Sequence, residues 1–181
     1  MCQLWHTGRV AHPDFSSHSC NSDNKYQTCV SASPTPIVSK SGKRGKTITY
    51  DGIVQDHGMP RALTTDEIQN RLLPDYRQAA QNAKDAGFDG VELHSAHGYL
   101  VDQFLNDGVN TRTDDYGGSV ENRCRLLTHV LDQALLPVWS PDQIGVRLSP
   151  HDAPNGGNTY YGCHDSNPDA IYSHAIQLLN Q

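Results

Sequence analysis

The sequence predicts an α/β fold that forms part of a TIM (β/α)8 barrel. Strand-like and helix-like segments alternate along its 181 residues, and this alternation is typical of a parallel sheet. Each of three strand segments carries aliphatic side chains at alternate positions, with polar or aromatic side chains between them. A doubly wound sheet is usually apolar on both faces, whereas a catalytic barrel presents polar groups near its strand ends. We therefore expect a partial barrel rather than a Rossmann-like sheet.

The first strand is expected at residues 2–6, where Gln3 and Trp5 share the polar face. Residues 8–60 then show no sustained helical period and are rich in Ser, Thr, Pro, Gly and Asn. Short strand-like fragments occur there at residues 28–32 and 47–50. A segment of this length with little regular structure is often a functional cap or lid. We expect residues 8–60 to form a long cap insertion.

The first helix follows Thr64, which with Glu67 matches the pattern of a capping box. Pro74 lies within the helical pattern, and we expect it to kink the helix or divide it. Gly87 is expected to mark the C-terminal end of this helix. The apolar stripe of this helix comprises Ile68, Leu72, Tyr76, Ala79, Ala80 and Ala83.

The second strand is expected at residues 90–94, immediately after that helix. Glu92 and His94 share one face of this strand, opposite Val91 and Leu93. The strand therefore has an aliphatic face that can pack under helices. Its other face carries a carboxylate and an imidazole.

A second helix is expected to begin after Ser119, and a third strand at residues 144–148. Gly145 and Arg147 share the polar face of that strand. The last helix is expected at residues 169–179. The apolar face of the second helix comprises Val120, Cys124, Leu127, Leu131 and Ala134. This order completes the alternation of strands and helices.

The composition excludes several classes of function. A formal net charge of −6 argues against a nucleic-acid binder or a protein of anionic membranes. The five cysteines are scattered and form no C-x-x-C pair, which favours reduced thiols in the cytoplasm. The N-terminal residues do not match a signal peptide, and no apolar run is long enough to cross a bilayer. We expect a soluble cytoplasmic protein that acts on a small molecule.

Three candidate catalytic residues cluster at the end of the second strand. His94, His97 and Tyr99 lie within six residues of one another and flank Gly98. Two imidazoles and a phenol supply hydrogen-bond donors and a proton source. Tyrosine has a reference pKa of about 10, so it stays protonated at neutral pH and can protonate a carbanion-like centre.

A metal site is the alternative interpretation of the same cluster, and it would indicate a metal-dependent hydrolase on a barrel. His94 and His97 have a ligand-like spacing, and Glu92, Cys163 and His164 are possible further ligands. No third ligand stands at a familiar distance, and the H-E-x-x-H signature is absent from the sequence. The glycine-rich loops that bind dinucleotides or phosphates are also absent from the sequence.

The chain resembles the Old Yellow Enzyme family of FMN-dependent ene-reductases, which includes oxophytodienoate reductases and a trypanosomatid prostaglandin F2α synthase. The His94-Ser-Ala-His-Gly-Tyr99 run and the segment at residues 110–123 are long and specific matches. The matches follow the order of the family along nearly the whole chain. The other matching segments are residues 3–9, 60–64, 86–93, 103–105 and 144–150.

The resemblance implies FMN as the cofactor and NAD(P)H as the co-substrate. By resemblance, Gln3 contacts the pyrimidine edge of the flavin. Arg147 resembles the cation beside the flavin N1–C2=O edge, where a fixed positive charge stabilises the reduced ring. Both residues lie on the predicted polar faces of their strands.

The resemblance also implies how a substrate is held. His94 and His97 resemble the pair that binds the oxygen of an activating carbonyl or nitro group. Tyr99 resembles the proton donor, and Trp5 the aromatic wall of the substrate pocket. The implied reaction reduces the activated C=C bond of an α,β-unsaturated carbonyl compound, or a related quinone, nitro or endoperoxide substrate.

The resemblance covers about strands 3 to 5 of the barrel, so residues 1–181 would form one partial domain. A full barrel typically needs about 250 residues. Two interpretations therefore stand beside the metal-dependent hydrolase. The chain is either part of a working ene-reductase or a truncated, non-catalytic product with at most a binding or structural role.

Overall fold

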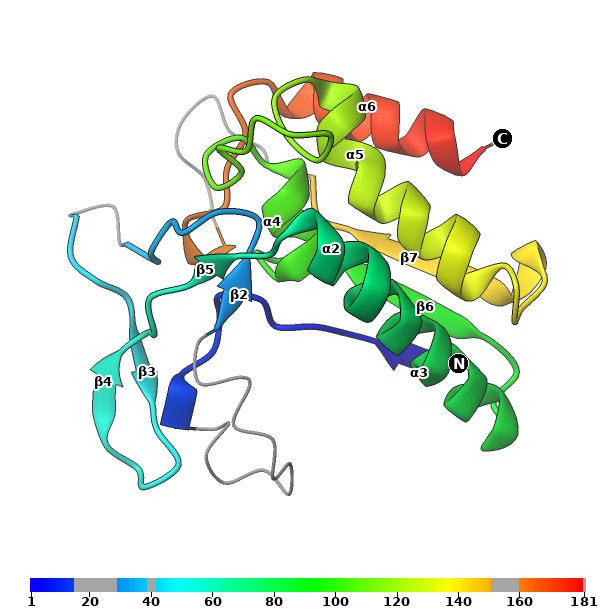
Figure 1. The fold of residues 1–181 in the computed structure, drawn as a ribbon, viewed down its shortest axis with the longest axis horizontal. Coiled ribbons are helices and arrows are strands. Elements are labelled where there is room, and N and C mark those ends of the chain that lie inside the picture. The colour runs from blue at the N-terminus through cyan, green and yellow to red at the C-terminus, as the bar shows by residue number, and fades with distance from the viewer. Residues whose placement is uncertain (15–28, 39–41, 151–159, 181) are drawn as a thin grey trace.

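A three-stranded parallel sheet is the centre of the computed structural model, which describes residues 1–14, 29–38, 42–150 and 160–180 (Figure 1). Strand β6 (Val91–Ser95) lies between β1 (Cys2–Leu4) and β7 (Ile144–Leu148). The predicted α/β fold with a parallel sheet is confirmed. The first strand is shorter than predicted and ends at Leu4, and β6 begins and ends one residue later than predicted.

The register of the sheet confirms the predicted faces. Leu4 pairs with Leu93, and Leu93 pairs with Val146, which aligns aliphatic side chains across the three strands. The neighbouring positions align Gln3 with Glu92 on the opposite face. Leu4 and Leu93 are buried in the core, so the aliphatic face is the one that packs under helices.

The helical segment after Thr64 packs against the sheet and comprises α2 (Thr65–Glu67), a π-helical turn (Ile68–Leu72) and α3 (Leu73–Asp85). The capping box of Thr64 and Glu67 is present as predicted. Pro74 lies in the first turn of α3, directly after the π-helical turn that separates α3 from α2. Its ring would clash with the carbonyl four residues earlier, and the wider π turn avoids this, with the Leu73 N–H donating to the Ile68 carbonyl.

Three helices lie over the same face of the sheet (Figure 1). Helix α5 (Val120–His129) continues into a π-helical segment (Val130–Leu135) that packs against α3, and α6 (Pro168–Leu179) packs against α5. The helices and the aliphatic strand face form one hydrophobic core. A short 3-10 helix (Pro141–Gln143) leads into β7, and another lies at Tyr160–Gly162 before α6. The predicted positions of the second and last helices are confirmed.

Helix α4 (Leu100–Leu105) has no counterpart among the predicted elements. All six of its residues are buried, including Asp102 and Gln103. The apolar periodicity that reveals an amphipathic helix needs more than one turn and one polar face. A short helix that is buried on every side shows no such pattern.

The described parts of residues 8–60 contain short strands and, at residues 13–14, a short piece of helix. Strand β2 (Val30–Ser31) pairs in parallel with β5 (Arg61–Ala62). Strands β3 (Lys46–Ile48) and β4 (Val54–Asp56) form an antiparallel hairpin. This hairpin extends away from the central sheet (Figure 1). Part of the predicted fragment at residues 28–32 is confirmed as β2, whereas residue 28 lies outside the described residues.

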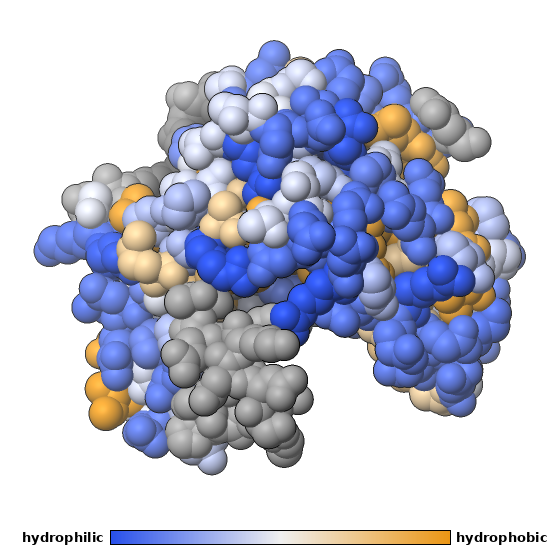
Figure 2. All heavy atoms as spheres, in the orientation of Figure 1, coloured by the Kyte–Doolittle hydropathy of each residue, from blue (hydrophilic) through white to orange (hydrophobic). Residues whose placement is uncertain are grey.

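Polar residues cover most of the surface shown in Figure 2, and apolar atoms gather at the tip of the hairpin. The exposed apolar side chains there are Ile48, Tyr50, Ile53 and Val54. Within the described ranges, no helix combines the length and apolar character that crossing a membrane requires.

Candidate functional site

The structure brings three of the predicted residues together at the carboxyl ends of β1 and β6. The Trp5 ring lies 4.8 Å from the Tyr99 ring and 6.1 Å from the His94 ring, measured between centroids. The Leu100 N–H donates to the His6 carbonyl, which ties the chain after β1 to the start of α4. This contact explains how residues nearly a hundred positions apart form one site.

The two predicted histidines lie side by side. The His94 ring centroid is 5.4 Å from that of His97 and 5.2 Å from that of Tyr99. His97 has a left-handed backbone with φ 57°, and its N–H donates to Ser149 Oγ at 2.8 Å. Ser149 follows β7, so a second strand end helps to hold the turn.

Gly98, between His97 and Tyr99, is held through both of its peptide groups. It has φ 78°, a conformation that glycine adopts without the penalty of a Cβ. Its N–H donates to Asp102 Oδ2 at 2.8 Å, and its carbonyl accepts from Gln103 Nε2 at 2.7 Å. No local pattern in the sequence indicates a role for Asp102 or Gln103. The only available signal was that Gln103 begins a segment matching the family.

Both histidines favour the neutral form. Burial lowers the pKa of His94, and the neighbouring His97 and Arg147 lower it further. Burial and then Arg147 lower the pKa of His97. A neutral imidazole keeps one N–H donor, so the pair can donate hydrogen bonds to a ligand oxygen without carrying charge.

Tyr99 retains its proton to a higher pH than an exposed tyrosine. Burial raises the pKa of Tyr99, and a hydrogen bond to Tyr161 raises it further. The Tyr161 ring lies 5.7 Å from that of Tyr99 and contacts His57 on its other side. Tyr161 could not be predicted as part of the site, because a tertiary contact alone brings it there.

Gln3 and Arg147 lie on the sheet face opposite the helices, as predicted. Gln3 Nε2 donates to Glu92 Oε1, and the Arg147 side chain is exposed beside His94 in the strand register. Within the part of the chain that the structure describes, no ion pair engages the Arg147 guanidinium. An amide and an unpaired cation on one open face fit a planar group that gains negative charge on reduction, as a flavin does.

The residues predicted as further metal ligands do not meet the histidine pair. Glu92 accepts from Gln3, Cys163 is buried beside Arg9, and the His164 ring packs against Gly108. No group of three or more metal-ligating side chains occurs among the described residues. The geometry therefore gives the metal interpretation no support.

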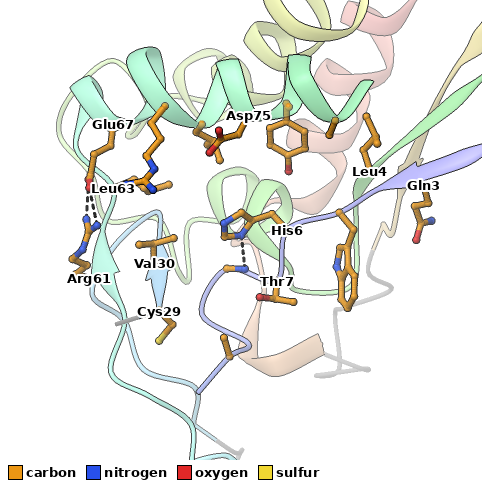
Figure 3. A pocket seen from close by; sticks show the side chains of 17 residues that line it. Gln3, Leu4, His6, Thr7, Cys29, Val30, Arg61, Leu63, Glu67 and Asp75 are labelled. Carbon is orange, nitrogen blue, oxygen red and sulfur yellow. Dashed lines mark hydrogen bonds and ion pairs between the residues drawn. The ribbon is translucent and has the colours of Figure 1, made fainter. Parts of the chain in front are cut away.

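A cleft of about 770 Å³ runs along the free edge of β1, between that strand and α3 (Figure 3). Gln3 and Leu4 line it from β1, His6 and Thr7 from the chain that follows this strand, and Asp75 from α3. It shares Gln3 and Trp5 with the site but contains neither His94 nor Tyr99. We attribute this cleft to the edge of β1 that pairs with no described strand, and not to the catalytic chemistry.

Known proteins are similar to this chain over nearly its whole length. It is 42% identical to putative 12-oxophytodienoate reductase 2 of Oryza sativa subsp. japonica, over 99% of this chain and 41% of the relative. It is 41% identical to 12-oxophytodienoate reductase 1 of the same organism, over 99% of this chain and 40% of the relative. The chain thus spans about two fifths of the length of these relatives.

Solved structures agree with these relatives. The Old Yellow Enzyme homologue from Zymomonas mobilis matches with a TM-score of 0.82 and 38% identity, over 98% of this chain and 43% of that one. Morphinone reductase in complex with tetrahydroNAD matches with a TM-score of 0.76 and 40% identity, over 97% of this chain and 44% of that one. The predicted resemblance to the Old Yellow Enzyme family is confirmed. Because the model of the NADH:flavin oxidoreductase / NADH oxidase family matches residues 1–167, the chain belongs to that family of FMN oxidoreductases.

Proposed function

We propose that the protein containing this chain reduces activated C=C bonds of α,β-unsaturated carbonyl compounds with NAD(P)H and FMN. The observation that carries the proposal is the cluster of a phenol and two imidazoles beside an aromatic wall. Family membership supports the redox chemistry, and the reductase names of the relatives support a small-molecule substrate. Related quinone, nitro or endoperoxide substrates fit the same cluster.

The chain's own residues would bind and protonate the substrate. His94 and His97 would donate hydrogen bonds to the substrate carbonyl oxygen and stabilise the enolate-like charge that develops there. Tyr99 would protonate the α-carbon, and Trp5 would form a wall of the pocket. Gln3 and Arg147 would hold the flavin. When bound, FMN supplies the hydride chemistry that connects NAD(P)H to the alkene.

We propose that the three parallel strands correspond to about strands 3 to 5 of a TIM barrel and that residues 8–60 form a cap insertion. The parallel order and the polar face support this assignment. The contacts of Ser31 and Arg9 with Gln103 connect the cap to the catalytic turn. The free thiols of Cys2, Cys29, Cys124 and Cys163 support the expected cytoplasmic location.

Separate measurement of the two half-reactions tests the proposed function. We expect the protein, in the longest form its gene encodes, to purify with yellow flavin that NAD(P)H bleaches and a cyclic enone reoxidises without oxygen. Flavin that NAD(P)H reduces but no enone, quinone or nitro compound reoxidises would contradict the proposal. A chain that takes up no flavin in this form would instead favour the non-catalytic alternative. A hydrolase activity that chelators abolish would favour the metal-dependent alternative.

A further inference from the structure

The turn that presents His97 and Tyr99 is held from beneath by two consecutive residues of α4. Asp102 accepts the Gly98 N–H, and Gln103 donates to the Gly98 carbonyl. Both side chains are fully buried. Neither belongs to the cluster of rings that forms the candidate site.

The geometry of this turn depends on those contacts because its backbone is unusual. His97 and Gly98 both have positive φ values, and a non-glycine residue in the left-handed region persists only when its surroundings enforce it. A displacement of about 1 Å in a catalytic group can cost roughly a hundredfold in rate. The contacts to Gly98 therefore bear directly on where the His97 and Tyr99 side chains lie.

Gln103 also connects this turn to other elements. Its Nε2 donates to the Thr7 carbonyl as well as to Gly98, and its Oε1 accepts from Ser31 Oγ at 2.9 Å. A Cβ on Gly8 would lie 2.3 Å from Gln103 Oε1, so a glycine is needed for the chain after β1 to approach this amide. The Gln103 amide thus joins the chain after β1 to the turn that precedes Tyr99.

Asp102 is a buried carboxylate with neutral hydrogen-bond donors. Its Oδ1 accepts from Asn106 Nδ2 at 2.9 Å and from the Tyr172 hydroxyl of α6 at 3.1 Å. Two other ionisable groups lie close to Asp102. The Cys163 thiol interacts with Asp102 electrostatically, and the Arg9 side chain forms a hydrogen bond with Cys163. Burial raises the pKa of Asp102 to about 6, against the lowering effect of its three donors. Asp102 therefore changes charge close to physiological pH.

A protonated Asp102 would also have an acceptor at hand. The Tyr172 hydroxyl oxygen lies 3.1 Å from Asp102 Oδ1, and a hydroxyl can accept the Asp102 O–H as well as donate to the carboxylate. Gly98 would then donate to a neutral carbonyl oxygen, and hydrogen bonds to neutral acceptors are roughly half as strong as those to charged ones.

We propose that Asp102 and Gln103 are positioning residues for the reaction, and that protonation of Asp102 loosens the turn that places His97 and Tyr99. The consequence for catalysis rests on the proposed function, whereas the coupling between Asp102 and Gly98 does not. The two can therefore be tested separately.

The first test follows the Gly98 amide by NMR in the flavin-free protein. We expect its ¹H and ¹⁵N shifts to titrate with the same midpoint as the Asp102 carboxyl carbon, near pH 6. Asp102→Asn should abolish that titration, and Asp85→Asn, at an exposed carboxylate on α3, should leave it intact. A Gly98 amide whose shifts are constant from pH 5 to 7 in the unmodified protein would overturn the proposal, whether or not the variant folds.

The second test measures alkene reduction against pH in the flavin-loaded protein. We expect the rate of flavin reoxidation by an enone to rise as the pH increases through about 6. Asp102→Asn should lower this rate about tenfold at pH 7 and should remove the part of the pH dependence that Asp102 causes. Asp102→Ala should be slower still in the same half-reaction. Unaltered pH profiles in Asp102→Asn would overturn the positioning role. A shared Gly98 and Asp102 titration without any enone reduction would instead overturn the proposed function alone.

Discussion

Tyr99 is suited to donate a proton because its surroundings keep the phenol neutral. Burial raises the pKa of Tyr99, and the hydrogen bond to Tyr161 has the same direction. The His94 and His97 rings beside it are neutral for the corresponding reason, since burial lowers the pKa of both. One site therefore offers a proton donor and two uncharged hydrogen-bond donors at neutral pH.

Tyr99→Phe removes the proposed proton donor and preserves the ring contact with Trp5. We expect it to slow alkene reduction by roughly 10²–10⁴-fold, the usual contribution of a general acid. Reduction of the flavin by NAD(P)H should stay nearly intact, as rapid-mixing measurement of each half-reaction would show. Tyr50→Phe, at an exposed position of the β3–β4 hairpin, is the matched control. An equal loss in both half-reactions would exclude Tyr99 as the proton donor.

Arg147 acts on the histidines through its charge. Because Arg147 contributes to the lowered pKa of both His94 and His97, Arg147→Gln should raise both pKa values part of the way to 6.5. Burial, the larger cause, remains in the variant, so the shift should be partial. NMR titration of the imidazole resonances measures it without flavin. The pKa of His129, which burial and Arg125 lower, should not change; a comparable shift at His129 would indicate a general change in the fold instead.

At the scale of elements, the capping box stabilises the helix that supports the sheet. Glu67 accepts from both the Thr64 backbone and the Arg61 guanidinium, and these contacts lower the pKa of Glu67 to about 2, with Arg61 the main cause. The carboxylate contributes its stability above the unfolded pKa of 4.5, and that contribution is lost as the pH falls toward 2.

Glu67→Gln should therefore destabilise the fold in a pH-dependent way. We expect a cost on the order of 1 kcal/mol at pH 7, since the pair is partly exposed to solvent. The difference in unfolding free energy between the two proteins should shrink from pH 4.5 to pH 2, as denaturant titrations at each pH would show. The contribution of Asp102 to stability has the opposite pH dependence and is lost as the pH rises through about 6. Because both proteins contain Asp102, this contribution cancels when their unfolding free energies are subtracted. A cost that is the same at every pH would contradict the role of the Glu67 charge.

At the scale of the whole molecule, the sheet is open on both sides. Among the described strands, β1 and β7 each pair only with β6. Gln3 and Arg147 are both exposed in the structure, on the sheet face opposite the buried aliphatic one. If only the Gln3 and Arg147 side chains contact a flavin on this open face, much of the bound flavin stays exposed to solvent.

We therefore expect the 181-residue chain alone to bind FMN weakly or not at all. Titration of the chain with FMN, followed by the quenching of flavin fluorescence, measures this affinity. Arg147→Gln is the control for any binding that occurs, because specific binding should depend on that cation. A dissociation constant in the micromolar range or tighter would contradict the expectation.

The elements and the polar sheet face could be predicted from the sequence because they depend on local patterns. Alternation along each strand assigned Gln3, Glu92 and Arg147 to one face, and the capping box located the start of the first helix. The outcome at Pro74 could not be predicted, because a π turn and a kink both relieve the same clash. Helix α4 was missed because a single buried turn has no amphipathic period.

The identity of the candidate site, His94, His97 and Tyr99 with Trp5, was contained in the sequence, since the chemistry of these side chains and their order along the chain are local properties. Its support was decided by the tertiary structure. Asp102, Gln103 and Tyr161 act through contacts between distant elements, and the pKa of Asp102 depends on its burial. Burial and contact arise only when the chain is packed, so no pattern along the sequence could indicate them.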